Sequence, residues 1–222
     1  MSSPVFLAFD TATSACSVAI LRDGEVLAHC FAEMARGQSE ALPPMIAEAL
    51  AQSGLSFREI TALAVTVGPG AFTGLRIGLA TARAMALAAD LPAIGVSTTE
   101  AIAEGVGQDE RAGRNLLVAV ESKREDVFAQ AFGTDLRPLG EIVSVRPEDA
   151  FALAPAPALL CGDAAARLPE APEGWLRATG SGLPDALHVA RVAARHWAEG
   201  RTRPAEPLYL RAPDVNLPKG AA

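Results

Sequence analysis

The chain has 222 residues, of which 50% are hydrophobic and 20% charged, and its formal net charge is −7. This composition excludes a disordered chain, and the acidic excess argues against a free-standing nucleic-acid binder, which would carry a basic face. Any nucleic acid would have to be held with a partner. No apolar run reaches the roughly 18 residues that cross a bilayer, and the start lacks the basic region of a signal peptide. We therefore expect a cytoplasmic protein without membrane attachment.

The first half of the chain predicts strands and helices in alternation. Asp23-Gly24 between two apolar segments is typical of a β-hairpin, and apolar residues at helical spacing follow Ser39, the expected N-cap, up to a stop at Gly54. Pro43 and Pro44 either lie in the first turns of that helix or kink it. The predicted elements are strands at 4–10, 15–22, 25–32, 60–67 and 93–97, and helices at 39–53 and 73–89.

The hairpin turn also predicts where two cysteines lie. If facing residues sum to 47, Cys16 pairs with Phe31, and Cys30 points to the opposite face of the sheet. Cys161 is far along the chain. Three unpaired thiols fit a reducing compartment.

The sequence pattern restarts after a polar linker at 105–115. Residues 115–142 repeat the order strand, acidic residue, turn, strand, turn and strand, with Glu121 where Asp10 stood. This predicts an α/β protein with a duplicated βββα unit and two lobes, 1–104 and 105–222. A helix is expected at 185–199, whereas most of 165–184 has the composition of a loop.

Asp10 ends the first strand and is followed by Thr11 and Thr13 in the hairpin turn. Such a turn offers amides and hydroxyls to phosphates, while the carboxylate holds the water shell of a metal. Alternatively, these side chains bond only the backbone of their own turn.

Glycines recur in "VTVGPGAFTGLRIGLA", where Gly68, Gly70 and Gly74 lie between a strand and a helix. The string is neither a Walker A loop nor a dinucleotide fingerprint, because no Gly-Lys-Ser/Thr follows and Thr73 stands where glycine is needed. The loop is suited to an anion. Equally, residues 74, 78, 82, 85 and 89 form a stripe of Gly, Ala and Met, and the small residues of such a stripe let another helix approach closely.

Other chemistry in the sequence is sparse. The segment "ESKRED" (121–126) is either a carboxylate cluster or a solvated turn. His188 and His196 lie two turns apart, which is not the spacing of a zinc-binding helix.

Four segments together resemble the bacterial TsaB (YeaZ) family: "LAFDTATSACSVAI", "VGPGAFTGLRIGLATARAMALA", "IGVSTTEAIA" and "EPLYLR". The resemblance runs from residue 5 to about 211. It implies the two-lobed fold of actin, hexokinase and the sugar kinases (the ASKHA fold), with the helix at 185–199 crossing back towards the first lobe. It also implies a role in making threonylcarbamoyladenosine (t6A) in tRNAs that read ANN codons.

The resemblance implies partners as well. A TsaD-like catalytic subunit would pair with this chain. A TsaE-like ATPase and tRNA would bind only through that complex. In the absence of these partners the chain would form a homodimer. In the family, corresponding helices of two subunits pack together. The residues expected at this interface are Met45, Ala49, Gly78, Ala82 and Met85.

Two departures from the catalytic paralogue suggest a non-catalytic chain. The resemblance implies a metal-binding His-x-x-x-His on the first long helix of the catalytic paralogue, whereas here Gln38 stands where many relatives keep a histidine, and no histidine follows. The second phosphate loop, "ESKRED", has no glycine. We therefore expect a partner subunit that binds no cofactor tightly by itself. ATP and Mg²⁺ would be held only at an interface of the complex. Asp10, Thr11, Thr13, Gly68, Gly70, Thr73 and Gly74 would then be a vestigial phosphate site. The alternative is an ATP-dependent, kinase-like phosphotransferase that uses Asp10 and the 68–74 loop.

Overall fold

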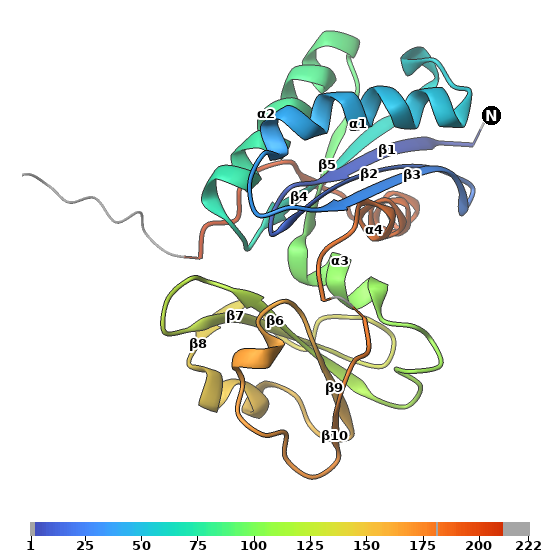
Figure 1. The fold of residues 1–222 in the computed structure, drawn as a ribbon. Coiled ribbons are helices and arrows are strands. Elements are labelled where there is room, and N and C mark those ends of the chain that lie inside the picture. Colours follow the sequence, from blue (N-terminus) through green and yellow to red (C-terminus); the bar gives the residue numbers. More distant parts are fainter. Residues whose placement is uncertain (1–2, 181, 211–222) are drawn as a thin grey trace, which may run out of the picture.

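The computed structural model describes residues 3–180 and 182–210 of the chain. These residues form two lobes, each built on one mixed β-sheet, with helix α3 (Thr98–Gly105) between them (Figure 1). The expected α/β class is confirmed. Arg211 of the "EPLYLR" segment lies outside the described residues. In the described part of the chain, no helix combines the length and the apolar character needed to cross a membrane.

The first sheet contains six strands in the order β11-β5-β4-β1-β2-β3, and the second contains five in the order β10-β9-β6-β7-β8. The strands of the first sheet are β1 (Val5–Asp10), β2 (Ala15–Arg22), β3 (Glu25–Glu33), β4 (Ala62–Gly68), β5 (Ala93–Ser97) and β11 (Arg203–Pro204). Those of the second are β6 (Asn115–Glu121), β7 (Val127–Phe132), β8 (Val143–Val145), β9 (Ala158–Cys161) and β10 (Trp175–Arg177).

The two sheets share one topology, since β8-β7-β6-β9-β10 repeats β3-β2-β1-β4-β5. This confirms the duplication and the two-lobed ASKHA-type fold, and it places Glu121 and Asp10 at the ends of equivalent strands. The connections differ. Helices α1 (Gln38–Ser53) and α2 (Phe72–Ala89) join the strands of the first lobe, whereas only the 3-10 turns Pro147–Leu153 and Ala165–Arg167 stand in their places in the second.

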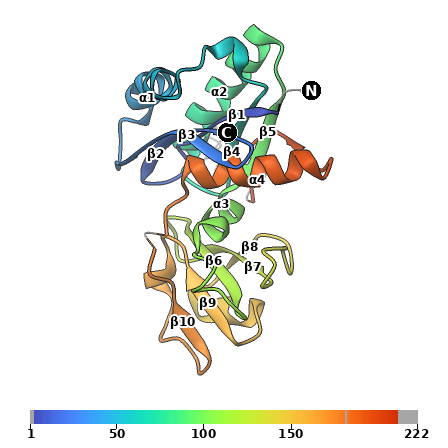
Figure 2. The same ribbon diagram turned by 90° about the vertical axis from the view of Figure 1, so that its right-hand side faces the viewer.

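Both faces of the first sheet are covered. Alternate residues of β1 face opposite sides: Leu7 and Phe9 belong to the core under α1 and α2, and Phe6 and Ala8 to the core under α4 (Ala186–Ala198). Figure 2 shows α4 lying across the face opposite to α1 and α2. Residues of the expected second unit, 105–222, thus return to the first sheet as α4 and β11.

Helix α3 was not predicted. Its first turn carries a capping box, in which Glu100 N donates to Ser97 Oγ at 3.2 Å and Ser97 N donates to Glu100 Oε2 at 3.0 Å. Ala101 packs in the core under α4, while Ile102 and Ala103 pack on the second sheet. A short helix with apolar residues on both sides shows little of the periodicity that marks an amphipathic one.

The expected hairpin register is wrong beyond the turn. Arg22 faces Glu25 as expected, but a bulge between Ile20 and Leu21 shifts the remaining pairs by one residue. Cys16 therefore faces Ala32 instead of Phe31. Because a shift of one residue reverses the face, Cys30 lies on the same side as Cys16. Both thiols, and that of Cys161, are free and buried.

Three further expectations need correction. Helix α1 begins after Gly37, which has a φ of 99°, and the Ser39 hydroxyl bonds Glu40 instead of capping the helix. Both prolines lie in the second turn of this helix, in agreement with the first of the two alternatives given for them. The third strand of the second lobe comes later than expected, as β8, and β10 lies in a stretch expected to be a loop.

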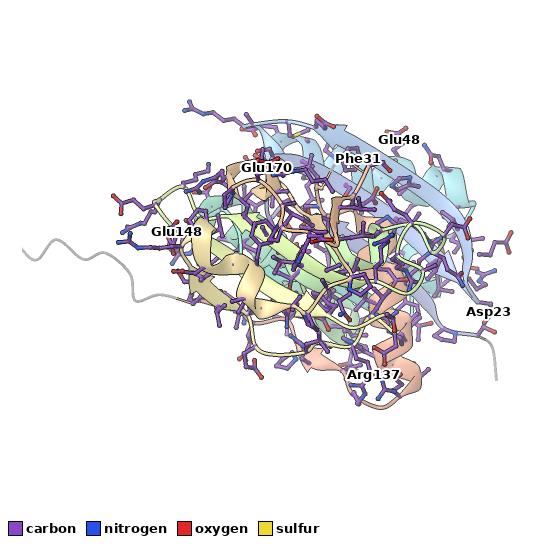
Figure 3. The ribbon with its side chains drawn as sticks, turned by 90° about the horizontal axis from the view of Figure 1, so that it is seen from below. Asp23, Phe31, Glu48, Arg137, Glu148 and Glu170 are labelled. Atoms are coloured by element: carbon purple, nitrogen blue, oxygen red, sulfur yellow. The ribbon has the colours of Figure 1, made fainter. Side chains whose placement is uncertain are left out.

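Seen from below, the exposed side chains of Arg137, Glu148 and Glu170 extend outwards from the second lobe (Figure 3).

Candidate functional site

The loops at the ends of β1, β4 and β6 meet between the lobes and enclose two hollows. The first hollow, of about 540 Å³, is lined by Pro69, Gly70, Ala71, Phe72, Leu75, Arg76, Glu121, Ser122, Lys123, Arg124, Phe128, Leu208, Tyr209 and Leu210. The second, of about 460 Å³, is lined by Thr13, Ser14, Ala35, Arg36, Gly37, Gln38, Ser39, Ala71, Phe72, Thr73, Gly74, Ile77, Glu121, Lys123 and Asp163. Glu121 and Lys123 border both.

Asp10 is completely buried and bonds its own lobe. Its Oδ1 accepts from Thr66 Oγ1 at 2.6 Å and from Ala12 N at 3.1 Å, while Oδ2 has no hydrogen-bond partner among the described residues. Burial raises the pKa of this carboxyl to about 7, against the opposing effect of the two hydrogen bonds. A carboxyl that is completely buried and borders neither hollow is not placed to reach a metal ion held in either of them.

Gly70 and Gly74 are explained by close packing on the β1–β2 turn. A Cβ on Gly70 would lie 2.3 Å from the carbonyl oxygen of Ala12, and one on Gly74 would lie 2.0 Å from that of Thr11. The Thr11 hydroxyl donates to Gly74 O at 2.7 Å, and Ala71 N donates to Ala12 O at 2.7 Å. The start of α2 therefore touches the turn backbone to backbone, which only glycine allows.

The remaining predicted phosphate-site residues are not gathered into one site. Thr13, Thr73 and Gly74 line the second hollow, and Gly70 lines the first. Gly68, with a φ of 119°, packs against Leu208 of the C-terminal segment, whose amide donates to Val67 O at 2.7 Å.

The loop after β6 satisfies its own polar groups. Lys123 N donates to Glu121 Oε1 and Arg124 N donates to Ser122 Oγ, while Arg167 holds Glu121 from the other side. Of the two hypotheses for "ESKRED", the carboxylate cluster is wrong: Glu121 pairs with Arg167, and Asp126 accepts from the Ser122 and Ser144 hydroxyls. The solvated turn is right, since Lys123, Arg124 and Glu125 are exposed, and Arg167 fixes its conformation. Sequence reasoning missed Arg167 because it lies in an irregular segment without periodicity.

Gln38 stands where the family resemblance places a histidine of the catalytic paralogue. Gln38 is buried, and its amide nitrogen donates to Thr13 O at 3.3 Å and to Met34 O at 3.2 Å. An amide nitrogen is a donor and not a metal ligand. Within residues 3–180 and 182–210, no group of three or more His, Cys, Asp or Glu is placed to hold a metal ion.

The five residues expected at the partner interface face mostly inwards. Ala49 and Ala82 are 0% exposed and Gly78 is buried, all three against the strands of their own lobe, while Met45 and Met85 are half-buried at the edge of the same core. The small residues of this stripe therefore serve close packing within the first lobe. The outward faces of the two helices carry other residues: Pro44, Ala47 and Ala51 on α1, and Ala80, Ala84, Leu87 and Ala88 on α2.

Comparisons with known proteins agree with this fold. Residues 26–165 match the family model described as TsaD, tRNA N6-adenosine threonylcarbamoyltransferase. A Haemophilus influenzae protein named tRNA threonylcarbamoyladenosine biosynthesis protein TsaB is 34% identical over 95% of each chain. The Escherichia coli protein of that name is 43% identical, over 58% of this chain and 55% of its own.

A solved structure matches almost the whole fold. YeaZ from Pseudomonas aeruginosa aligns with a TM-score of 0.79 and 28% identity, covering 95% of this chain and all of that one. With sequence and structure in agreement over nearly its full length, the chain belongs to the TsaB (YeaZ) family.

Proposed function

We propose that this chain is a non-catalytic partner subunit that pairs with a TsaD-like catalytic subunit in the t6A modification of ANN-decoding tRNAs. Two relatives carry t6A biosynthesis in their names, and the TsaD family model matches part of this chain. The observation that carries the non-catalytic role is the state of the two strand-end loops. Several of their polar groups bond the protein itself, as described for Asp10 Oδ1, the Thr11 hydroxyl and Glu121 Oε1.

The same observation favours a chain that binds no cofactor tightly. Nucleotide phosphates need backbone amides that point into the cleft, but Ala71 N and Lys123 N are both bonded to groups of this chain. ATP and Mg²⁺ would then be held only where a second subunit completes a site. The kinase-like alternative requires the opposite, namely ATP binding and hydrolysis by the isolated protein.

We place the partner surface on the outward faces of α1 and α2. Leu87 is 87% exposed, and Ala80, Ala84 and Ala88 extend along one side of the same helix. Small residues let a partner helix approach closely, and a stable interface buries roughly 800 Å² on each side. A TsaE-like ATPase and tRNA would be engaged through the resulting complex, in the cytoplasm, and a homodimer would use the same faces when the chain is alone.

Three arginine variants test this surface. Ala84→Arg places a charge on the proposed interface. Ala112→Arg places the same charge on the exposed loop before β6, and Ala82→Arg places it in the core. An unpaired charge buried on binding costs several kcal/mol, so a loss of about 3 kcal/mol would weaken the complex by roughly 100-fold.

We expect Ala84→Arg to keep the native circular dichroism spectrum but to lose its complex with the TsaD-like subunit and t6A in cells. Ala112→Arg should behave as the wild type, and Ala82→Arg should unfold. Wild-type affinity of folded Ala84→Arg would remove this face from consideration. Binding and hydrolysis of Mg-ATP by the isolated wild type would favour the kinase-like alternative.

A further inference from the structure

The loop after β6 holds a carboxylate in the way that proteins hold a bound oxyanion. Glu121 Oε1 accepts from Lys123 N at 2.5 Å and from Arg167 Nη1 at 2.5 Å. A backbone amide and a guanidinium that converge on one oxygen are the donors that phosphate and carboxylate groups share. Here the oxyanion is part of the chain itself.

The donors are held in place independently of Glu121. Arg167 Nη2 donates to the carbonyl oxygens of Arg124 and Glu125, so two further contacts fix the guanidinium. Lys123 has a φ of 59°, a left-handed conformation, and concave turns of this kind direct amides towards an anion. Removing the Glu121 side chain would therefore leave both donors facing the space that it occupied.

That space opens to the cleft between the lobes. Glu121 borders both hollows, and its side chain is 31% exposed. Asp163 lines the second hollow and accepts from Glu121 N at 2.9 Å. Its carboxylate would repel an incoming anion, which limits how tightly one could bind.

We propose that the cleft contains an oxyanion site, formed by Lys123 N and Arg167, that the Glu121 carboxylate permanently fills. The ligand class of the opened site is a small oxyanion such as inorganic phosphate. In the wild type, the filled site ties the end of β6 to the Ala165–Arg167 turn and excludes external phosphate. This inference does not rest on the proposed function, because it concerns the isolated chain without tRNA or partner.

The test compares phosphate binding by the full-length wild type with that of Glu121→Ala and Glu125→Ala, at constant ionic strength with chloride as the reference anion. Both variants remove one negative charge from the same loop. Only the first empties the site, because the exposed Glu125 contributes just its carbonyl oxygen to Arg167. Inorganic phosphate is titrated while the amide resonance of Lys123 is followed by NMR.

We expect Glu121→Ala to bind phosphate at least tenfold more tightly than the wild type and Glu125→Ala, with a shift of the Lys123 resonance. Adding Arg167→Gln to Glu121→Ala should abolish the gain. Should Glu121→Ala fail to fold, Glu121→Ser offers the same opening with a short polar side chain. Equal phosphate affinity for a folded Glu121 variant and Glu125→Ala would overturn the proposal, as would a gain that survives the loss of Arg167.

Discussion

The contact between α2 and the β1–β2 turn leads to a quantitative prediction for Gly74→Ala. The added Cβ would lie 2.0 Å from the carbonyl oxygen of Thr11, against at least 3.4 Å for an ordinary van der Waals contact. This oxygen belongs to the backbone, which cannot rotate away as a side chain can. The helix or the turn must therefore move, and the 2.7 Å hydrogen bond from Thr11 Oγ1 to Gly74 O would be strained.

The expected loss of stability combines three effects. Overpacking costs about 1–3 kcal/mol, and a lost hydrogen bond costs about 1 kcal/mol. The better helix propensity of alanine returns only about 0.5–1 kcal/mol. A net loss of about 2 kcal/mol lowers Tm by roughly 4–8 °C in a protein of this size.

The assay is thermal unfolding followed by circular dichroism, with Gly107→Ala as the control. A Cβ on Gly107 would meet nothing within 4 Å, so its Tm should stay close to that of the wild type. If Gly74→Ala melted at or above the wild-type temperature, close packing would not be the reason for this glycine.

Two buried carboxyls should give opposite dependences of stability on pH. The pKa of Asp10 is raised to about 7 in the folded state. Between about pH 4 and 7 the folded protein therefore keeps a proton on Asp10 that the unfolded chain has lost, and the free energy of unfolding falls as the pH rises through this range. Asp10→Asn should remove that slope in urea unfolding at pH 5 and 7.5; an unchanged slope would contradict the burial effect. Burial alone would raise the pKa of Glu100, but His196, Arg203 and Ser97 lower it to about 2. Its contribution is therefore complete above about pH 4.5 and is lost as the pH falls towards 2, so Glu100→Gln should destabilise the protein at pH 7 far more than at pH 2.5. An equal loss at both pH values would show that the charge of Glu100 does not matter.

Much of the fold was predictable because most elements are long and carry a regular apolar pattern. The strands at 4–10 and 93–97 and the duplication were found in this way. The bulge between Ile20 and Leu21 was not, since no glycine or other turn residue marks it, and it reversed the face of Cys30. Helix α3 was missed although Ser97 and Glu100 have the spacing of a capping box.

The site was predictable only in part. The glycine string pointed to the correct loop, but the sequence could not show whether the stripe from Gly78 to Ala82 faced a partner or the protein's own sheet, because both environments favour small residues. The Glu121–Arg167 pair joins residues 46 positions apart, one of them in an irregular segment. Contacts of this kind depend on tertiary structure and leave no local signal.

The return of α4 and β11 to the first sheet makes the second lobe an insertion within the first. During synthesis all strands of the second sheet are complete once residue 177 has emerged, while one face of the first sheet still lacks its cover. The N-terminal lobe, although made first, must therefore be the last to finish folding. A fragment that ends at residue 104 would expose the apolar side chains of Phe6 and Ile94 that α4 normally covers, so we expect this fragment to aggregate when it is produced alone.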